Sequence, residues 1–138
     1  IPQITSIFIP VGSGTTLLGI SQSLNPSVKI FAIQPASNCP LSKNFDQDYQ
    51  PETENITDAI SAKYLPLKSQ INSVIKNNNG TGLVVQNKDI IEAQKELESK
   101  KIKTSLEGAM ALAGFKKAIK NKIETGSYPV ILLTGCQR

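Results

Sequence analysis

The sequence predicts an α/β domain of three layers, in which a mainly parallel β-sheet is flanked by helices. Two observations support this prediction. Short apolar runs rich in β-branched residues alternate along the chain with segments whose apolar residues recur at helical spacing. The first strand–helix–strand unit has short connections, and such units form right-handed crossovers between parallel strands. With 138 residues, the chain has the usual size of one domain, so we expect residues 1–138 to form a single unit.

Each predicted element follows from a local pattern. The predicted strands are the four apolar runs Ile4–Pro10, Val28–Gln34, Thr81–Gln86 and Tyr128–Thr134. The predicted helices are Thr15–Leu24, a short Ile56–Lys63, Leu65–Lys76, a helix Lys88–Lys100 capped by Asn87, and a long helix from Ser105 to Ile123. The stretch Ala36–Asn55 has no period, and we interpret it as a long loop, either functional or a plain surface excursion.

Two helices carry further patterns. In the helix that Asn87 is predicted to cap, the expected inward stripe is Ile90, Ile91, Gln94 and Leu97. The long helix should pack very closely through the small residues Gly108, Ala109, Ala111, Ala113 and Gly114. Its lysines are expected to form a solvated face; they are Lys116, Lys117, Lys120 and Lys122.

Composition excludes several classes of site. The chain has no histidine, so Ser/His/Asp triads, Cys/His pairs and histidine-based metal sites are excluded within it, and we predict no metal site. The two cysteines, Cys39 and Cys136, are too few for a disulfide framework, and we expect free thiols in a cytoplasmic protein. The net charge of +4 is spread out and aromatic residues are few, which argues against nucleic-acid binding. No apolar run approaches the length that spans a membrane.

The most informative stretch is the corner between the first strand and the first helix. Gly12 and Gly14 permit a tight turn, and hydroxyls follow at Ser13, Thr15 and Thr16. The first amides of a helix lack intrahelical partners and carry the positive end of its dipole, so a phosphate could bind there. The corner matches neither the Walker nor the dinucleotide pattern. From these residues alone, an anion site and a purely structural turn are both open.

Two further candidates lie where a ligand of an open α/β sheet would bind, beyond the carboxyl ends of the strands. Thr134 closes the last strand, and Glu107 stands at the start of the small-residue helix. A phosphate at the corner and a polar ring atom near Thr134 would form one elongated site for a phosphorylated aromatic cofactor. The alternatives are a local hydroxyl–backbone contact for Thr134 and a favourable first-turn acid for Glu107.

The order of these motifs resembles a known family. The blocks Pro10–Thr16, Lys29–Pro35, Leu106–Gly114 and Val130–Gly135 resemble the C-terminal half of the fold-type-II pyridoxal-phosphate enzymes, most of all threonine synthase. The resemblance implies pyridoxal 5′-phosphate as cofactor. It implies that the Gly12–Thr16 loop holds the phosphate.

Further implications concern the ring and the substrate. Thr134 would bond the pyridine nitrogen, and Glu107 would lie near the ring. A hydroxyl at Thr134 suits elimination and replacement chemistry on an amino-acid substrate. For threonine synthase this is the conversion of O-phosphohomoserine to threonine.

The resemblance also predicts what the chain lacks. In this family the Schiff-base lysine precedes the glycine loop, which here begins at residue 12. We therefore expect a C-terminal fragment that has no catalytic residue of its own, is inactive alone, and partners with a missing N-terminal half in a homo-oligomer. A threonine dehydratase or cysteine synthase fragment is one alternative. A stand-alone phosphate-binding module is another, and an inert piece that is stable only on a partner surface is a third.

Overall fold

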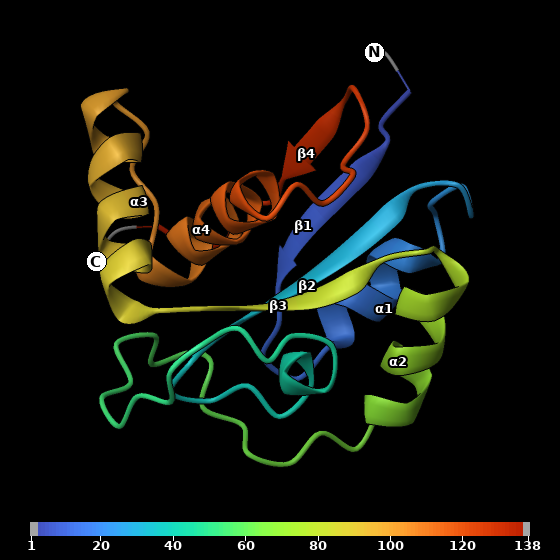
Figure 1. The fold of residues 1–138 in the computed structure, drawn as a ribbon, viewed down its shortest axis with the longest axis horizontal. Helices are drawn as coiled ribbons and strands as arrows, with labels where there is room; N and C mark the ends of the chain where they lie inside the picture. The colour runs from blue at the N-terminus through green and yellow to red at the C-terminus, as the bar shows by residue number, and fades with distance from the viewer. Residues whose placement is uncertain (1–2, 137–138) are drawn as a thin grey trace.

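The sheet is entirely parallel and has four strands. A computed structural model describes residues 3–136, and Figure 1 shows its strands in the order β3-β2-β1-β4. Their bounds are β1 Ser6–Pro10, β2 Lys29–Pro35, β3 Thr81–Val85 and β4 Pro129–Ile131. The register pairs Phe8 of β1 with Phe31 of β2 on one side and with Ile131 of β4 on the other. The predicted fold class is confirmed, and β3 and β4 are the two edges of the sheet.

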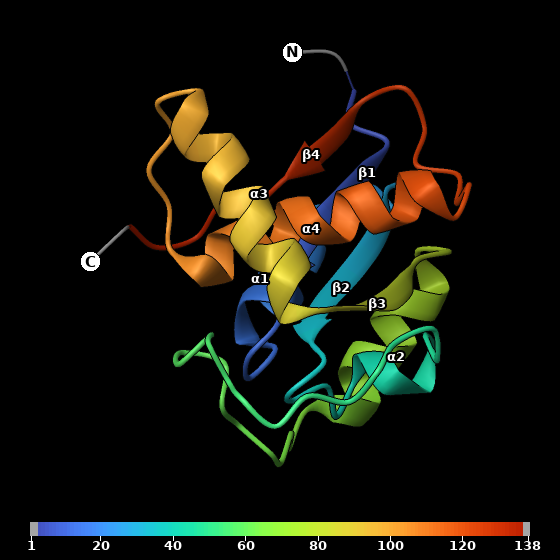
Figure 2. The same cartoon turned by 60° about the vertical axis from the view of Figure 1, so that its left-hand side comes forward.

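Helices cover both faces of this sheet. The helices are α1 Thr15–Ser21, the 3-10 turn η1 Ser42–Asn44, α2 Lys68–Asn77, α3 Asn87–Ser99 and α4 Leu106–Lys120. In Figures 1 and 2, α3 and α4 lie together on one face, while α1 and α2 lie on the other. The long segment 36–67 runs below the carboxyl ends of the central strands, and it is called the excursion from here on.

The two faces of the sheet give two apolar clusters. Strand residues alternate between them, as the pleat of a strand requires. Phe8 and Phe31 point toward α3 and α4 and stack with ring centroids 4.4 Å apart. Ile9 and Ile30 point the other way, toward Leu17 of α1 and the buried residues of α2. These buried faces fix the register of the central strands, because a shift of one residue would expose both sets.

The small-residue face of α4 packs as the sequence predicts. Gly108, Gly114 and the alanines between them are buried. A Cβ atom at Gly114 would lie 2.5 Å from Cδ1 of Ile33, which is far closer than van der Waals contact. Ser105 is the N-cap of this helix, and its Oγ accepts a hydrogen bond from the Gly108 N–H at 3.2 Å. The beginning of α4 is thereby held close to the sheet.

Three predicted helix features are wrong. The segment predicted as the helix Ile56–Lys63 is irregular, because the Asn55 Oδ1 accepts hydrogen bonds from the N–H and the hydroxyl of Thr57. Such side-chain bonds offer the backbone an alternative to a helix. Asn87 is not a cap; it is the first residue of α3, and its N–H donates to Glu52 at 2.9 Å. Within α3, Ile91 is 39% exposed, so the inward stripe excludes it.

Two other findings concern cysteines and membranes. Cys39 is buried and Cys136 is exposed, and both are free thiols as expected. Across residues 3–136, no helix combines the length and the apolar character that crossing a bilayer requires.

Candidate functional site

The corner after β1 forms an open turn, in which the Thr15 N–H donates to the Ser13 Oγ at 3.4 Å. Gly14 has φ of +89°, a left-handed conformation that favours glycine, and a Cβ there would lie 2.0 Å from Cδ1 of Ile71. The first hydrogen bond of α1 runs from the Leu18 N–H to the Gly14 carbonyl, so the amides just before Leu18 have no intrahelical acceptor. The side chains of Ser13, Thr15 and Thr16 are exposed beside them. These groups fit the oxygen atoms of a phosphate.

Thr134 follows β4, the strand that pairs with β1. The Leu132 N–H donates to the Phe8 carbonyl at 3.1 Å, so the chain continues alongside β1 beyond the end of β4. Thr134 and Val11 each lie three residues beyond the paired Ile131 and Phe8, so both follow neighbouring strands at the carboxyl end of the sheet. Thr134 is half-buried, and within residues 3–136 its hydroxyl forms no hydrogen bond. Its carbonyl accepts from Ser105 at 2.9 Å, which fixes this stretch against the start of α4.

Glu107 and the corner meet the same piece of the excursion. The Ala59 N–H donates to the Glu107 carboxylate at 3.1 Å. The Ala59 carbonyl oxygen lies 3.6 Å from the position that a Cβ of Gly12 would occupy. Ala59 therefore connects two of the three predicted sites, and Thr134 contacts the first turn of α4 that carries Glu107. The predicted residues lie together at the carboxyl end of the sheet, although their role in binding stays a prediction.

A buried glutamine joins this corner to the excursion. Gln34, at the end of β2, is 1% exposed. Its amide nitrogen donates to the Val11 carbonyl at 3.2 Å, and its Oε1 accepts from the N–H groups of Leu41 and Ser42 at 2.9 Å each. One side chain thus satisfies backbone groups from two loops, which buried polar groups require. Residue patterns had not singled out Gln34, although a polar residue inside an apolar strand was a visible signal.

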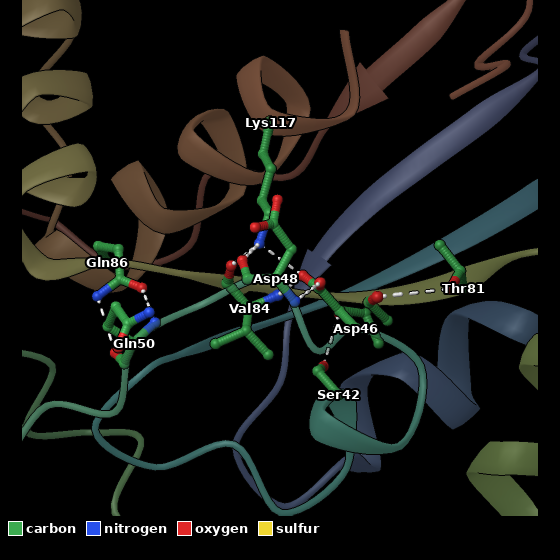
Figure 3. Close-up of polar contacts among 10 residues, drawn as sticks. Ser42, Asp46, Asp48, Gln50, Thr81, Val84, Gln86 and Lys117 are labelled. Atoms are coloured by element: carbon green, nitrogen blue, oxygen red, sulfur yellow. Dashed lines mark hydrogen bonds and ion pairs between the residues drawn. The ribbon is translucent and has the colours of Figure 1, made fainter. Parts of the chain in front are cut away.

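An ion pair fastens the excursion to β3 (Figure 3). Lys117 Nζ lies 2.7 Å from Asp46 Oδ2, with the two side chains 16% and 8% exposed. The same ammonium donates to the carbonyls of Asp48 and Val84 at 2.6 and 2.7 Å. Asp46 Oδ2 also accepts from the Val84 N–H at 2.8 Å. The prediction that all the α4 lysines form a solvated face is therefore wrong for Lys117, whereas Lys116 makes an exposed pair with Glu96.

The residue that follows β3 also forms hydrogen bonds with the excursion. Gln86, the N-cap of α3, exchanges hydrogen bonds with the backbone of Gln50, as Figure 3 shows. The Glu52 carboxylate accepts from Gln86 and from the first amide of α3. A cavity of about 760 Å³ lies between this part of the excursion, α3 and α4, and residues of the glycine corner do not line it. Nearby, a hydrogen bond with Cys39 and burial raise the pKa of Tyr49 above its ordinary value.

Comparison with known proteins identifies the fold and the family. Residues 1–135 match the family described as pyridoxal-phosphate dependent enzyme. The chain belongs to this family. Members of the family use pyridoxal 5′-phosphate. The narrower resemblance to threonine synthase is not confirmed.

Solved structures of this family share the fold. A serine racemase from Dictyostelium discoideum aligns over 100% of the chain with a TM-score of 0.76 and 24% identity. Maize serine racemase gives 0.76 and 23% over 100% of the chain, and a T.th. threonine deaminase gives 0.75 and 18% over 98%. The chain spans 46%, 45% and 49% of these proteins, respectively, which is about half of their length. No curated protein matches the chain.

Proposed function

We propose that this chain supplies the phosphate and pyridine contacts of a pyridoxal-phosphate enzyme that acts on a hydroxy amino acid or its phosphate ester. The observation that carries the proposal is that the Gly12–Thr16 corner and Thr134, whose hydroxyl has no partner within residues 3–136, follow two neighbouring parallel strands, β1 and β4. The bound cofactor would supply an electron sink for the substrate carbanion. The chain's own groups would hold the phosphate with helix amides and exposed hydroxyls, and orient the ring through Thr134.

Glu107 is proposed to lie beside the ring, through its contact with Ala59. We assign no catalytic residue to this chain, and the Schiff-base lysine is proposed to belong to a missing N-terminal half. Two reactions are candidates: conversion of O-phosphohomoserine to threonine, and dehydration of threonine. Similar structures named as threonine deaminases favour the second at least as strongly as the first. A homo-oligomer in the cytoplasm remains our expectation.

A pair of ligands tests the proposed contacts in the isolated chain. Inorganic phosphate and 4′-deoxypyridoxine phosphate would be titrated while amide resonances are followed by NMR. The second ligand lacks the aldehyde that reacts with surface lysines. Both ligands should shift the amides of residues 13–17. Thr134→Val should weaken only the ring-bearing ligand, by about three- to tenfold, because one hydrogen bond is lost.

The matched control is Thr81→Val, on the far edge of the sheet, which should leave both affinities unchanged. If neither ligand shifts the amides of the corner, the cofactor assignment is wrong. If phosphate binds but Thr134→Val has no effect on the larger ligand, the pyridine contact is wrong and the chain is better described as a phosphate-binding module.

A further inference from the structure

Segment 57–60 of the excursion lies against the glycine corner. The buried side chain of Ile60 packs in the apolar cluster that contains Phe8. Its Cγ1 atom lies 3.9 Å from the position that a Cβ of Gly12 would occupy, and the Ala59 carbonyl oxygen lies 3.6 Å from the same position. These are ordinary contact distances, so the segment packs directly on the first residue of the corner.

Polar contacts attach this segment on two sides. Within the excursion, the side-chain amides of Asn38 and Asn55 donate to the Ile60 carbonyl at 3.4 and 3.5 Å. From α4, the Glu107 carboxylate accepts a hydrogen bond from the Ala59 N–H at 3.1 Å. The first two bonds are long and neutral, whereas a hydrogen bond to a carboxylate is charge-assisted and stronger. We therefore expect Glu107 to be the main polar attachment of the segment.

The same turn of α4 also holds the other end of the proposed site. Ser105, the N-cap of α4, donates its hydroxyl to the Thr134 carbonyl at 2.9 Å. Glu107 belongs to the first turn that follows this cap. Glu107 contacts Ala59, which packs on Gly12 at the proposed phosphate end, while Ser105 holds the proposed ring end. One turn of a packed helix thus connects two loops that follow different strands.

We propose that Glu107 is a positioning residue: by accepting the Ala59 N–H, it holds segment 57–60 against Gly12 and keeps the corner in the shape that binds phosphate. This inference rests on the proposed function, because it concerns the same corner. A positioning role needs only an acceptor oxygen at residue 107. A carboxylate that faced the bound phosphate would instead repel it through its charge. The two roles therefore predict different effects when the charge alone is removed.

The test uses the 138-residue chain, with inorganic phosphate as the probe and the amides of residues 13–17 followed by NMR. Glu107→Gln keeps an acceptor oxygen and loses the charge, whereas Glu107→Ala loses both. Glu107→Ala should raise the phosphate dissociation constant about three- to tenfold and speed hydrogen exchange at the Ala59 amide by a similar factor, because one hydrogen bond is lost. Glu107→Gln should leave both quantities within about twofold of the unaltered chain.

Asp89→Ala is the matched control, because Asp89 is the acid in the first turn of α3, as Glu107 is in that of α4. It should change neither quantity. Tighter phosphate binding in both Glu107 variants would show that the carboxylate acts on the ligand through its charge, and would overturn the proposal. An unchanged dissociation constant in Glu107→Ala, with or without faster exchange at Ala59, would also overturn it, while the proposed function would stand. If the unaltered chain does not bind phosphate at the corner, the proposed function is wrong and this proposal is wrong with it.

Discussion

The two edges of this sheet differ in how their backbone groups are satisfied. At β3, the outward N–H and C=O of Val84 bind Asp46 and Lys117, and η1 packs against Gly82. At β4, within residues 3–136, the outward groups of Ile131 have no strand beside them. Both strands are short and uncharged, so their own sequences do not determine which edge is closed. The closed edge is the one that the excursion covers, and the difference shows that a mostly irregular loop can terminate a sheet.

The largest expected effect comes from breaking the closed edge at Lys117. Lys117→Met would leave a buried carboxylate on Asp46 and remove a donor from the carbonyls of Asp48 and Val84. We expect the free energy of unfolding in urea to fall by about 3–5 kcal/mol, as for other buried pairs that lose one partner. Lys116→Met is the control, since its pair with Glu96 is 44% and 40% exposed and should contribute only about 0–1 kcal/mol. Equal effects of the two substitutions would contradict this account.

A smaller loss of stability is expected from a substitution that displaces η1 from β3. A Cβ at Gly82 would lie 2.8 Å from the Cα of Ser42 and 3.1 Å from the Phe45 ring. Gly82→Ala should therefore destabilise the protein by about 1–3 kcal/mol, as overpacking does. Gly19→Ala is the control, because no atom lies within 4 Å of its added methyl group, and it should be neutral or stabilising in thermal unfolding. If Gly82→Ala is neutral as well, η1 does not pack tightly on the edge.

Amide exchange compares the two edges directly, without any substitution. In dilute solution, the Val84 amide bonded to Asp46 should exchange at least about tenfold more slowly than the outward Ile131 amide. Resolved NMR peaks recorded after transfer to deuterated buffer would measure both rates. Similar rates for the two amides would mean that the closed edge opens as readily as the free one.

The smallest expected effect concerns the exposed pair beside the closed edge. A hydrogen bond and attraction from Lys116 lower the pKa of Glu96, and Glu96 in turn raises the pKa of Lys116. The stabilisation from Glu96 is thus present above its unfolded-state pKa and lost as pH falls through its lowered pKa; that from Lys116 is lost as pH rises through its raised pKa. In Lys116→Met, an NMR titration should find the Glu96 pKa moved upward. An unchanged pKa would contradict the pair.

The sequence was sufficient to predict the strands and helices of the central layers, but it did not predict the path of the excursion. Alternating apolar runs predicted all four strands, because buried parallel strands have a strong local signature. The start of α2 was placed too early, since Pro66 disfavours helical geometry at Leu65 and the helix begins only at Lys68. The partner of Lys117 was out of reach, because Asp46 is 71 positions away in the sequence. Helical period shows which residues share a face, but not which loop will cover that face.

For the candidate site, local motifs predicted the corner, Thr134 and Glu107, and missed Ala59. Gly12 and Thr134 carry recognisable patterns at strand ends, and parallel neighbours bring such ends together. Ala59 has no distinctive chemistry and meets Glu107 through its backbone N–H. A backbone contact of this kind depends on the path of the excursion, which Asn55 and Thr57 set through local hydrogen bonds.

The buried amide of Gln34 constrains how the two segments that it bonds can be exchanged, in evolution and in engineered chimeras. Because it bonds Val11 on one side and Leu41 and Ser42 on the other, the turn after β1 and the segment after β2 share one polar partner. A chimera that takes the segment after β2 from a relative must bring a compatible residue at position 34, or leave three backbone groups without partners. These two stretches should therefore recombine and diversify as a unit, although more than twenty residues separate them.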